Sequence, residues 1–353
     1  MISITIPAGS LAPHVKAVSA IIKRGIKRQQ KAHNDGKKRL LKCELSFYSA
    51  IAPNVQTFVE LTPSALEQEF AALYASHPDF IVFASGSLTN IRRHIGPARR
   101  LALYEQLWRR HKTDDAACRC VFCQVSSRAQ SVFNWSAFIK RSKDAPRESI
   151  ADRFVKGVGL KVCPYCSRNH IAPLAEPDRT IYRPDLDHFF AQSVYPYFAL
   201  CLYNLVPSCS ACNCRIKGAV DFLRQDYFHP YEHTAPQQLF VLEGSGVTNV
   251  RRLDPNRAVL RLHRGIDKRA KKSAEFFQLP LAYKAHVEEA CHFAEALRLF
   301  PDSFIKELAR MLKVDVHYLM LILDRPDDQV DDRYKHQVLG TLKRDLRLMF
   351  RKR

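Results

Sequence analysis

The spacing of polar and apolar residues predicts a mainly helical chain. The first six residues alternate as a short strand does, and from Leu11 to Ala32 the pattern becomes helical. Residues 60–112 also have a helical pattern, with Thr62 or Ser64 as the expected N-cap residue. Residues 145–162 predict a further helix that leads into a cysteine-rich centre. Helices should therefore surround this centre.

One helical segment near the C-terminus resembles a DNA-recognition motif only loosely. Residues 305–323 have the apolar spacing of a helix-turn-helix, but any pair of packed helices has the same spacing. We treat this segment as two packed helices, with a recognition helix as the weaker alternative.

The chain is strongly basic. Lysine and arginine together number 55 against 35 acidic residues, which gives a formal net charge of +20. Such an excess favours a polyanionic partner, because neutralising phosphates releases condensed counterions. Lys23, Lys27 and Arg28 lie along one face of the first predicted helix and are predicted to contact phosphates. A solvated helix face is the alternative explanation for them.

The end of the chain predicts a second basic region. A basic amphipathic helix or tail is expected there, carrying Lys343, Arg344, Arg347, Arg351, Lys352 and Arg353. The two basic regions would hold a nucleic-acid backbone from both sides, which positions the substrate without selecting its base sequence.

The eleven cysteines are expected to bind metal rather than to form disulfides. No apolar run approaches the roughly 18 residues that span a membrane, and the opening residues MISITIPAGS lack the features of a secretory signal. We therefore expect a cytoplasmic protein, and clustered cysteines in a reducing compartment are usually metal ligands.

Two CxxC pairs predict a structural zinc site. Cys163 and Cys166 form one pair, and Cys209 and Cys212 form the other. Each CxxC turn presents two thiolates to one ion, and two turns complete the tetrahedron that Zn²⁺ prefers. Four unconnected buried cysteines are the weaker alternative.

The other cysteines have less clear roles. Cys118, Cys120 and Cys123 offer three ligands without an obvious fourth, and we expect them to be small packing residues. A second metal site completed by His111 is the alternative. Cys214 could compete as a ligand at the second CxxC pair, and core positions are expected for Cys43, Cys201 and Cys291.

Residues suited to phosphodiester chemistry lie between and just after the two CxxC pairs. Asp187 precedes His188, Asn204 opens an apolar stretch, and Asn213 follows Cys212 directly. An isolated Asp-His pair is common without any function, and Asn204 alone would be an ordinary turn residue. Their joint order around the two cysteine pairs is what makes them a candidate site.

This order resembles the HNH endonucleases of the ββα-metal (His-Me finger) superfamily. The phrases CPYC, DLDHF, NLVPSC and CN, followed by His229-Pro230-Tyr231, are similar to the HNH nucleases of prokaryotic anti-phage defence systems of the Septu type. The resemblance covers residues 161–231. It departs from the usual pattern at Ala191-Gln192, where the family has Pro-Lys. The third motif position is Asn213 instead of His, a variant that many family members share.

The resemblance implies a role for each residue. His188 would be the general base, and Asn204 would hydrogen-bond the backbone of the loop that carries it. Asp187 and Asn213 would bind one catalytic Mg²⁺ or Mn²⁺. Asp185 would be an auxiliary ligand or a surface carboxylate without a role. Arg215 and Lys217 would contact phosphate.

We therefore expect an α+β protein with a small ββα-metal HNH module at residues 151–232, between mainly helical basic regions at 1–150 and 233–353. The module would hydrolyse nucleic acid, by family analogy double-stranded DNA, leaving 5′-phosphate and 3′-hydroxyl ends. A controlling protein partner such as an ATPase is expected, because unrestrained nuclease activity is toxic. The alternatives are a zinc-stabilised nucleic-acid-binding module without catalysis and an RNA-cleaving effector.

Overall fold

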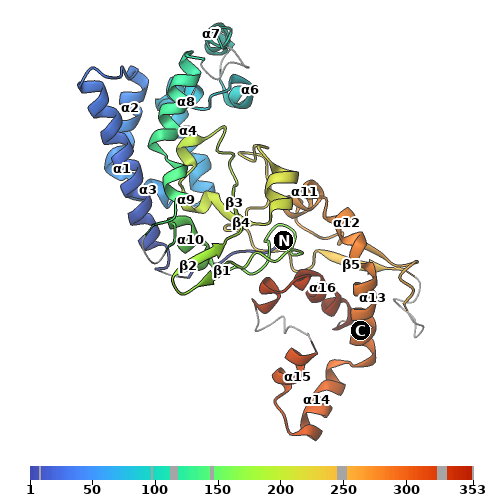
Figure 1. Ribbon diagram of the computed structural model, residues 1–353. Helices are drawn as coiled ribbons and strands as arrows, with labels where there is room; N and C mark the ends of the chain where they lie inside the picture. The colour runs from blue at the N-terminus through green and yellow to red at the C-terminus, as the bar shows by residue number, and fades with distance from the viewer. Residues whose placement is uncertain are drawn as a thin grey trace.

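The computed structural model of the protein describes residues 1–7, 9–96, 98–111, 118–143, 147–244, 253–323 and 332–351. Helices dominate these residues, and their strands form three separate two-stranded antiparallel sheets (Figure 1). These elements confirm the prediction of a largely helical chain with small β elements.

Helices account for the regular structure of the N-terminal part, on the upper left of Figure 1. In chain order they are α1 (Ala12–Asn34), α2 (Lys42–Ile51), η1 (Ala52–Asn54), α3 (Val55–Val59), α4 (Pro63–Ser76), α5 (Pro78–Ala84), α6 (Leu88–Ile91), η2 (Arg92–His94), α7 (Ala98–Trp108), α8 (Val121–Val132), α9 (Trp135–Ile139) and α10 (Ile150–Val158). The helices expected at 11–32, 60–112 and 145–162 are therefore present, and Thr62 is the N-cap residue of α4.

Helix α1 packs closely against α8. A Cβ atom at Gly25 would lie 2.7 Å from the Cα atom of Val132, so only glycine permits this approach. The Arg28 guanidinium donates to the carbonyl and hydroxyl oxygens of Ser131, at 2.9 and 2.8 Å. Arg28 thus joins two helices, while Lys23 and Lys27 point to solvent.

The central part contains two of the hairpins. Strands β1 (Leu174–Glu176) and β2 (Arg179–Tyr182) form the first, and β3 (Asp185–His188) and β4 (Leu205–Ser208) form the second. Two short helices, η3 (Pro196–Phe198) and η4 (Leu202–Asn204), lie between β3 and β4, and the π-helix η5 (Ala211–Lys217) follows β4. In the second hairpin, Asp187 pairs with Val206 and His188 with Leu205.

Helix α10 leads the chain into this central part. Ser149 and Asp152 form a reciprocal capping box at its start, and Gly159 ends it in the left-handed conformation at φ 69°. The buried carboxylate of Asp152 also accepts a hydrogen bond from Arg141 at 2.9 Å and lies 3.4 Å from the Nε atom of Arg183. Because Arg183 shortly precedes β3, this carboxylate ties α10 to the start of the second hairpin.

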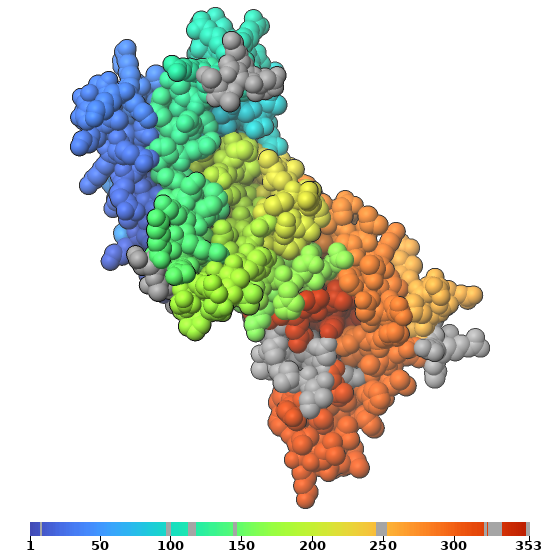
Figure 2. All heavy atoms as spheres, viewed as in Figure 1, coloured from blue at the N-terminus to red at the C-terminus, as the bar shows by residue number. Residues whose placement is uncertain are grey.

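The C-terminal part contains the third hairpin and further helices. They are β5 (Phe240–Glu243), β6 (Val259–Leu262), α11 (Lys268–Phe276), α12 (Leu279–Ala282), η6 (Tyr283–His286), α13 (Val287–Leu299), α14 (Asp302–Leu312), α15 (Val316–Ile322), η7 (Asp332–His336) and α16 (Gly340–Arg351). Residues 305–323 form α14 and α15, as the packed-helix interpretation predicted. These two helices project from the body of the molecule and share a small core of their own (Figure 2).

One continuous hydrophobic core joins the regions on both sides of the cysteine-rich centre. The expected N-terminal strand is absent from the described residues. Ile2 and Ile4 are buried instead, and their backbone amides donate to the carbonyl oxygens of Pro164 and Pro230, at 2.9 and 2.7 Å. From the other end, the Leu339 amide donates to Ser167 at 2.7 Å. Segments from both flanking regions therefore contact the centre.

The basic C-terminal region differs from its prediction. Arg344 and Arg347 on α16 are buried and paired with acidic groups, Arg344 with Asp345 and Arg347 with Asp302. Because α16 packs on α13 and β5, these two side chains face the interior and do not present a phosphate-binding face. Lys352 and Arg353 lie outside the described residues. None of the described helices combines the length and apolarity that a membrane crossing requires.

The network around Asp152 should stabilise the fold only above acidic pH. Burial alone would raise the pKa of this carboxyl, but the hydrogen bonds from Arg141 and Ser149 outweigh it and its pKa is lowered. A lowered pKa gives stability that is present above about pH 3.9 and lost as the pH falls through the folded-state pKa. Asp152→Asn should cost about 2 kcal/mol of unfolding free energy at pH 7.

Urea denaturation at several pH values measures this cost. The difference from the native chain should shrink as the pH falls below about 3.9, and it should vanish only below the folded-state pKa, where Asp152 is protonated in both states. Asp178→Asn, at an exposed aspartate in the β1–β2 turn, should change stability by no more than about 0.5 kcal/mol. A difference that is the same at pH 3 and pH 7 would contradict the electrostatic account.

Candidate metal centre and active site

Four cysteines converge at one buried point. Each of Cys163, Cys166, Cys209 and Cys212 is buried, and their sulfur atoms all lie within 4.8 Å of one another. The Sγ atoms of Cys166 and Cys209 are 4.0 Å apart. Ligands at about 2.3 Å from a tetrahedral Zn²⁺ lie about 3.8 Å apart, so this group could hold zinc. The alternative of four unconnected cysteines is excluded.

The backbone around each CxxC pair folds as a tight turn. The Ser167 amide donates to the carbonyl of Cys163 at 2.8 Å, and the Asn213 amide donates to the carbonyl of Cys209 at 3.0 Å. The side-chain amide of Asn169 donates to the Cys209 sulfur at 3.2 Å. Such N–H donors favour a thiolate, which is the form that binds metal.

Asp187 is buried beside this group and both of its oxygens are engaged. The Tyr165 hydroxyl donates to one oxygen at 2.5 Å, and the Lys217 ammonium donates to the other at 2.9 Å. Tyr165 lies between Cys163 and Cys166, and Lys217 ends η5. The carboxylate therefore joins the first CxxC turn, β3 and the helix after the second CxxC turn.

Lys217 is placed differently from its prediction. Its side chain is fully buried, and its ammonium also donates to the carbonyl oxygen of His188 at 2.6 Å. Burial of the ammonium is possible because Asp187 compensates its charge. Lys217 therefore does not present a surface cation for phosphate, whereas Arg215 is exposed as expected.

Asn213 lies beside Asp185 in this structure. Its side-chain amide donates to Asp185 at 3.3 Å, and the Cys214 thiol donates to the same oxygen at 3.3 Å. The half-buried Asp185 and the buried Asp187 are two residues apart on β3, so their side chains leave the strand on the same face. Oxygen donors thus gather between β3 and η5, but among the described residues Asp187 and Asn213 are hydrogen-bonded to other groups and not to each other.

His188 is held by a backbone carbonyl. Its Nε2 atom lies 3.1 Å from the carbonyl oxygen of Ala199, which can only accept, so Nε2 carries the proton and the lone pair is on Nδ1. Trp135 of α9 packs edge-on against the imidazole, with ring centroids 4.6 Å apart. Burial of the ring lowers the pKa of His188 to about 4, more than the charge of Asp187 raises it, and the ring is neutral at pH 7.

Asn204 makes the backbone hydrogen bonds that were predicted for it. Its side-chain oxygen accepts from the Phe190 amide at 2.7 Å, and its side-chain nitrogen donates to the carbonyl oxygens of Phe190 and Phe198, at 3.2 and 3.1 Å. Asn204 is fully buried. It therefore connects the segment after His188 to the segment that carries Ala199, whose carbonyl orients the imidazole.

Sequence reasoning missed three partners of the site. Tyr165 has a sequence indication, because it lies inside the first CxxC pair, but tyrosines are common there and its carboxylate partner is 22 residues away. Trp135 and Ala199 have none, because only the tertiary fold brings them to His188.

A second group of ligands is present at the outer end of the N-terminal helices. His111, Cys118, Cys120 and Cys123 are half-buried, and their ligand atoms all lie within 4.8 Å of one another. This geometry favours the alternative interpretation, a second metal site completed by His111, over the expectation that the three cysteines are small packing residues. Cys43 is half-buried, whereas Cys201 and Cys291 are buried as predicted.

Comparisons with protein-family models, with curated proteins and with solved structures found no match to this chain.

The Asp187–Lys217 pair provides a sharp stability test. Lys217→Met leaves the buried carboxylate without its cation and should cost about 3 kcal/mol of unfolding free energy. Asp187→Asn combined with Lys217→Met should lose less than the sum of the two single variants, because neither charge is then left alone. Urea denaturation in the presence of zinc measures all three. Arg215→Met, which removes an exposed cation two residues away, is the matched control. If the double variant lost the sum of the free energies lost by the two single variants, the buried ion pair would be contradicted.

Proposed function

We propose that the chain is a metal-dependent phosphodiester hydrolase of the HNH type, in which β3, β4 and η5 form a ββα-metal module. The observation that carries this proposal is the setting of His188. A neutral imidazole with one nitrogen fixed by the Ala199 carbonyl leaves the other nitrogen as a proton acceptor. That is the arrangement a general base needs.

The role of His188 follows from this geometry. Nδ1 would take a proton from the water that attacks the scissile phosphorus, and a positioned base of this kind typically contributes a factor of about 10²–10⁴ to the rate. Asn204 would act through His188, since its hydrogen bonds to Phe190 and Phe198 fix both segments around the ring.

Asp187 and Asn213 would hold the catalytic Mg²⁺ or Mn²⁺. Their carboxylate and amide oxygens are the hard ligands that such cations prefer, and Asp185 adds a third oxygen donor nearby. When bound, the cation neutralises charge that develops on the phosphate and the leaving oxygen. The Lys217 ammonium already donates to one oxygen of Asp187, so a cation held by this carboxylate would have to share or displace that contact. The Cys163, Cys166, Cys209 and Cys212 group, with soft sulfur ligands, would hold a structural Zn²⁺.

Nucleic acid is the substrate that fits the charge of the chain. The net charge of +20 and the exposed side chains of Lys23 and Lys27 on α1 support a phosphate backbone as partner. Double-stranded DNA and a role in prokaryotic defence follow from the resemblance to Septu-type nucleases. A controlling partner such as an ATPase belongs to the same proposal, and full activity of the isolated chain would count against it.

A nucleic-acid-binding module without catalysis is the second candidate. The observation in its favour is that both oxygens of Asp187 are already occupied by Tyr165 and Lys217. A site that keeps this ion pair has no free carboxylate for a catalytic cation. An RNA-cleaving effector would share the mechanism of the first candidate and differ in its substrate.

His188→Ala should abolish metal-dependent cleavage and leave zinc binding unchanged. The native chain and the variant are incubated with plasmid, linear duplex, single-stranded DNA and RNA, each with and without Mg²⁺ or Mn²⁺. Removal of the general base should lower the cleavage rate by at least about 10²-fold. His317→Ala, at an exposed histidine on α15, should cleave at the native rate.

The outcomes separate the candidates. Cleavage of duplex DNA by the native chain and not by the His188→Ala variant supports the HNH proposal. Cleavage of RNA with no effect on DNA selects the effector. If the native chain and the His188→Ala variant bind nucleic acid equally and neither cleaves it, the non-catalytic module is the better description.

A further inference from the structure

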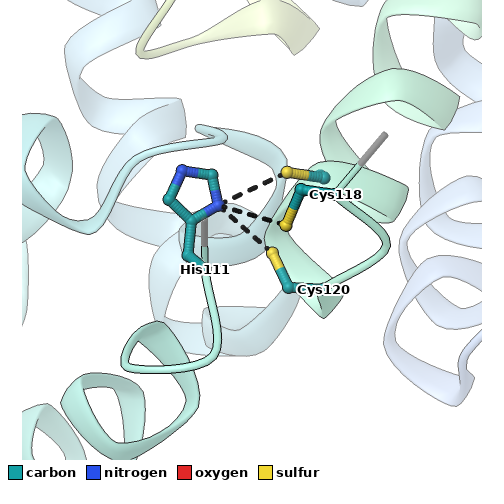
Figure 3. A group of neighbouring side chains, drawn as sticks. His111, Cys118 and Cys120 are labelled. Carbon is teal, nitrogen blue, oxygen red and sulfur yellow. Dashed lines mark hydrogen bonds between the residues drawn. The ribbon is translucent and has the colours of Figure 1, made fainter. Parts of the chain in front are cut away.

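The group of His111, Cys118, Cys120 and Cys123 lies where α7 ends and α8 begins, far along the chain from the candidate active site (Figure 3). The Nδ1 atom of His111 points toward the three sulfur atoms. It lies 3.4 Å from the sulfurs of Cys120 and Cys123 and 3.8 Å from that of Cys118. One histidine nitrogen and three thiols therefore face a common point.

These distances are those between ligands on a tetrahedral zinc ion. With Zn–N of about 2.05 Å and Zn–S of about 2.3 Å, a nitrogen and a sulfur on neighbouring corners lie about 3.5 Å apart. The three observed separations span this value. A neutral thiol makes only weak hydrogen bonds, so attraction between these groups does not explain why three sulfurs surround one nitrogen.

Local structure presents each ligand to the same point. Cys120 is the N-cap residue of α8 and Cys123 is three residues further on, so both side chains lie over the first turn. The imidazole of His111 stacks on Trp108 at the end of α7, with ring centroids 4.1 Å apart, and Trp108 packs against Phe122 of α8.

We propose that His111, Cys118, Cys120 and Cys123 bind one Zn²⁺ that clamps the end of α7 to the start of α8. Three thiolates and one imidazole form a closed ligand set typical of structural zinc. All eleven cysteines are free, so no disulfide competes for these sulfurs. This site is independent of the proposed nuclease function, because it shares no residue with the module from β3 to η5.

The two cysteine groups should differ in how fast they release metal. The ligands of the outer group are half-buried, whereas Cys163, Cys166, Cys209 and Cys212 are all buried. A chelator reaches a half-buried ion without unfolding the protein around it. The outer zinc should therefore leave first, and the inner zinc only when the core opens.

Zinc content tests this proposal. The native chain, purified under reducing conditions with zinc supplied, should contain two zinc ions, one for each group. Cys120→Ser should contain one, and Cys43→Ser, at a half-buried free cysteine outside both groups, should keep two. His111→Cys replaces the imidazole by a thiolate and should also keep two.

Cobalt substitution identifies the ligands. The visible absorption of Co²⁺ depends on how many thiolates bind it, so His111→Cys should shift the band of one of the two ions. This readout does not depend on stability, and it remains valid if Cys120→Ser folds poorly. The site would be established by two metal ions in the native chain together with a shifted cobalt band in His111→Cys. One zinc per chain, unchanged in Cys120→Ser, or a cobalt spectrum unchanged by His111→Cys, would overturn it.

Discussion

The buried carboxylate of Asp187 is the constraint on which the central part of the molecule depends. A charged group without access to water must find its compensation inside the protein. Asp187 finds it in Tyr165 from the first CxxC turn and Lys217 from the end of η5. One side chain therefore fixes the relative positions of three segments that are far apart in the sequence.

The ion pair between Asp187 and Lys217 also determines the environment of His188. Lys217 donates both to Asp187 and to the carbonyl of His188, so the ion pair also holds the backbone of β3. Asn204 holds the far side of the loop with three hydrogen bonds. The imidazole sits between these two polar networks and against Trp135, which explains why it can be both rigid and neutral.

Sequence reasoning succeeded where spacing alone determines geometry. Two CxxC pairs predicted the convergence of Cys163 and its three partners. The backbone hydrogen bonds of Asn204 were predicted by the family resemblance and not by spacing. It failed where tertiary contacts decide. Lys217 was predicted to lie on the surface but is buried, because the carboxylate of Asp187, 30 residues away, accepts a hydrogen bond from its ammonium. Likewise, Arg344 is paired with Asp345 inside the core, and the net charge of the sequence does not reveal such a pairing.

The outer cysteine group was predicted only as the weaker alternative, for a related reason. Its histidine follows the end of one helix and its cysteines lie at the start of the next, so no short sequence motif contains all four ligands. The packing of Trp108 against Phe122 is what brings the two helix ends together.

The contact between Ser167 and the segment that leads into α16 has a consequence for protein synthesis. Thr341 and Ser167 are 174 residues apart in the chain. A ribosome that adds about 5–20 residues per second needs about 9–35 s to cover these 174 residues. During this time the first CxxC turn has been made but its covering helix has not. The candidate site therefore reaches its final packing only when nearly the whole chain has been translated.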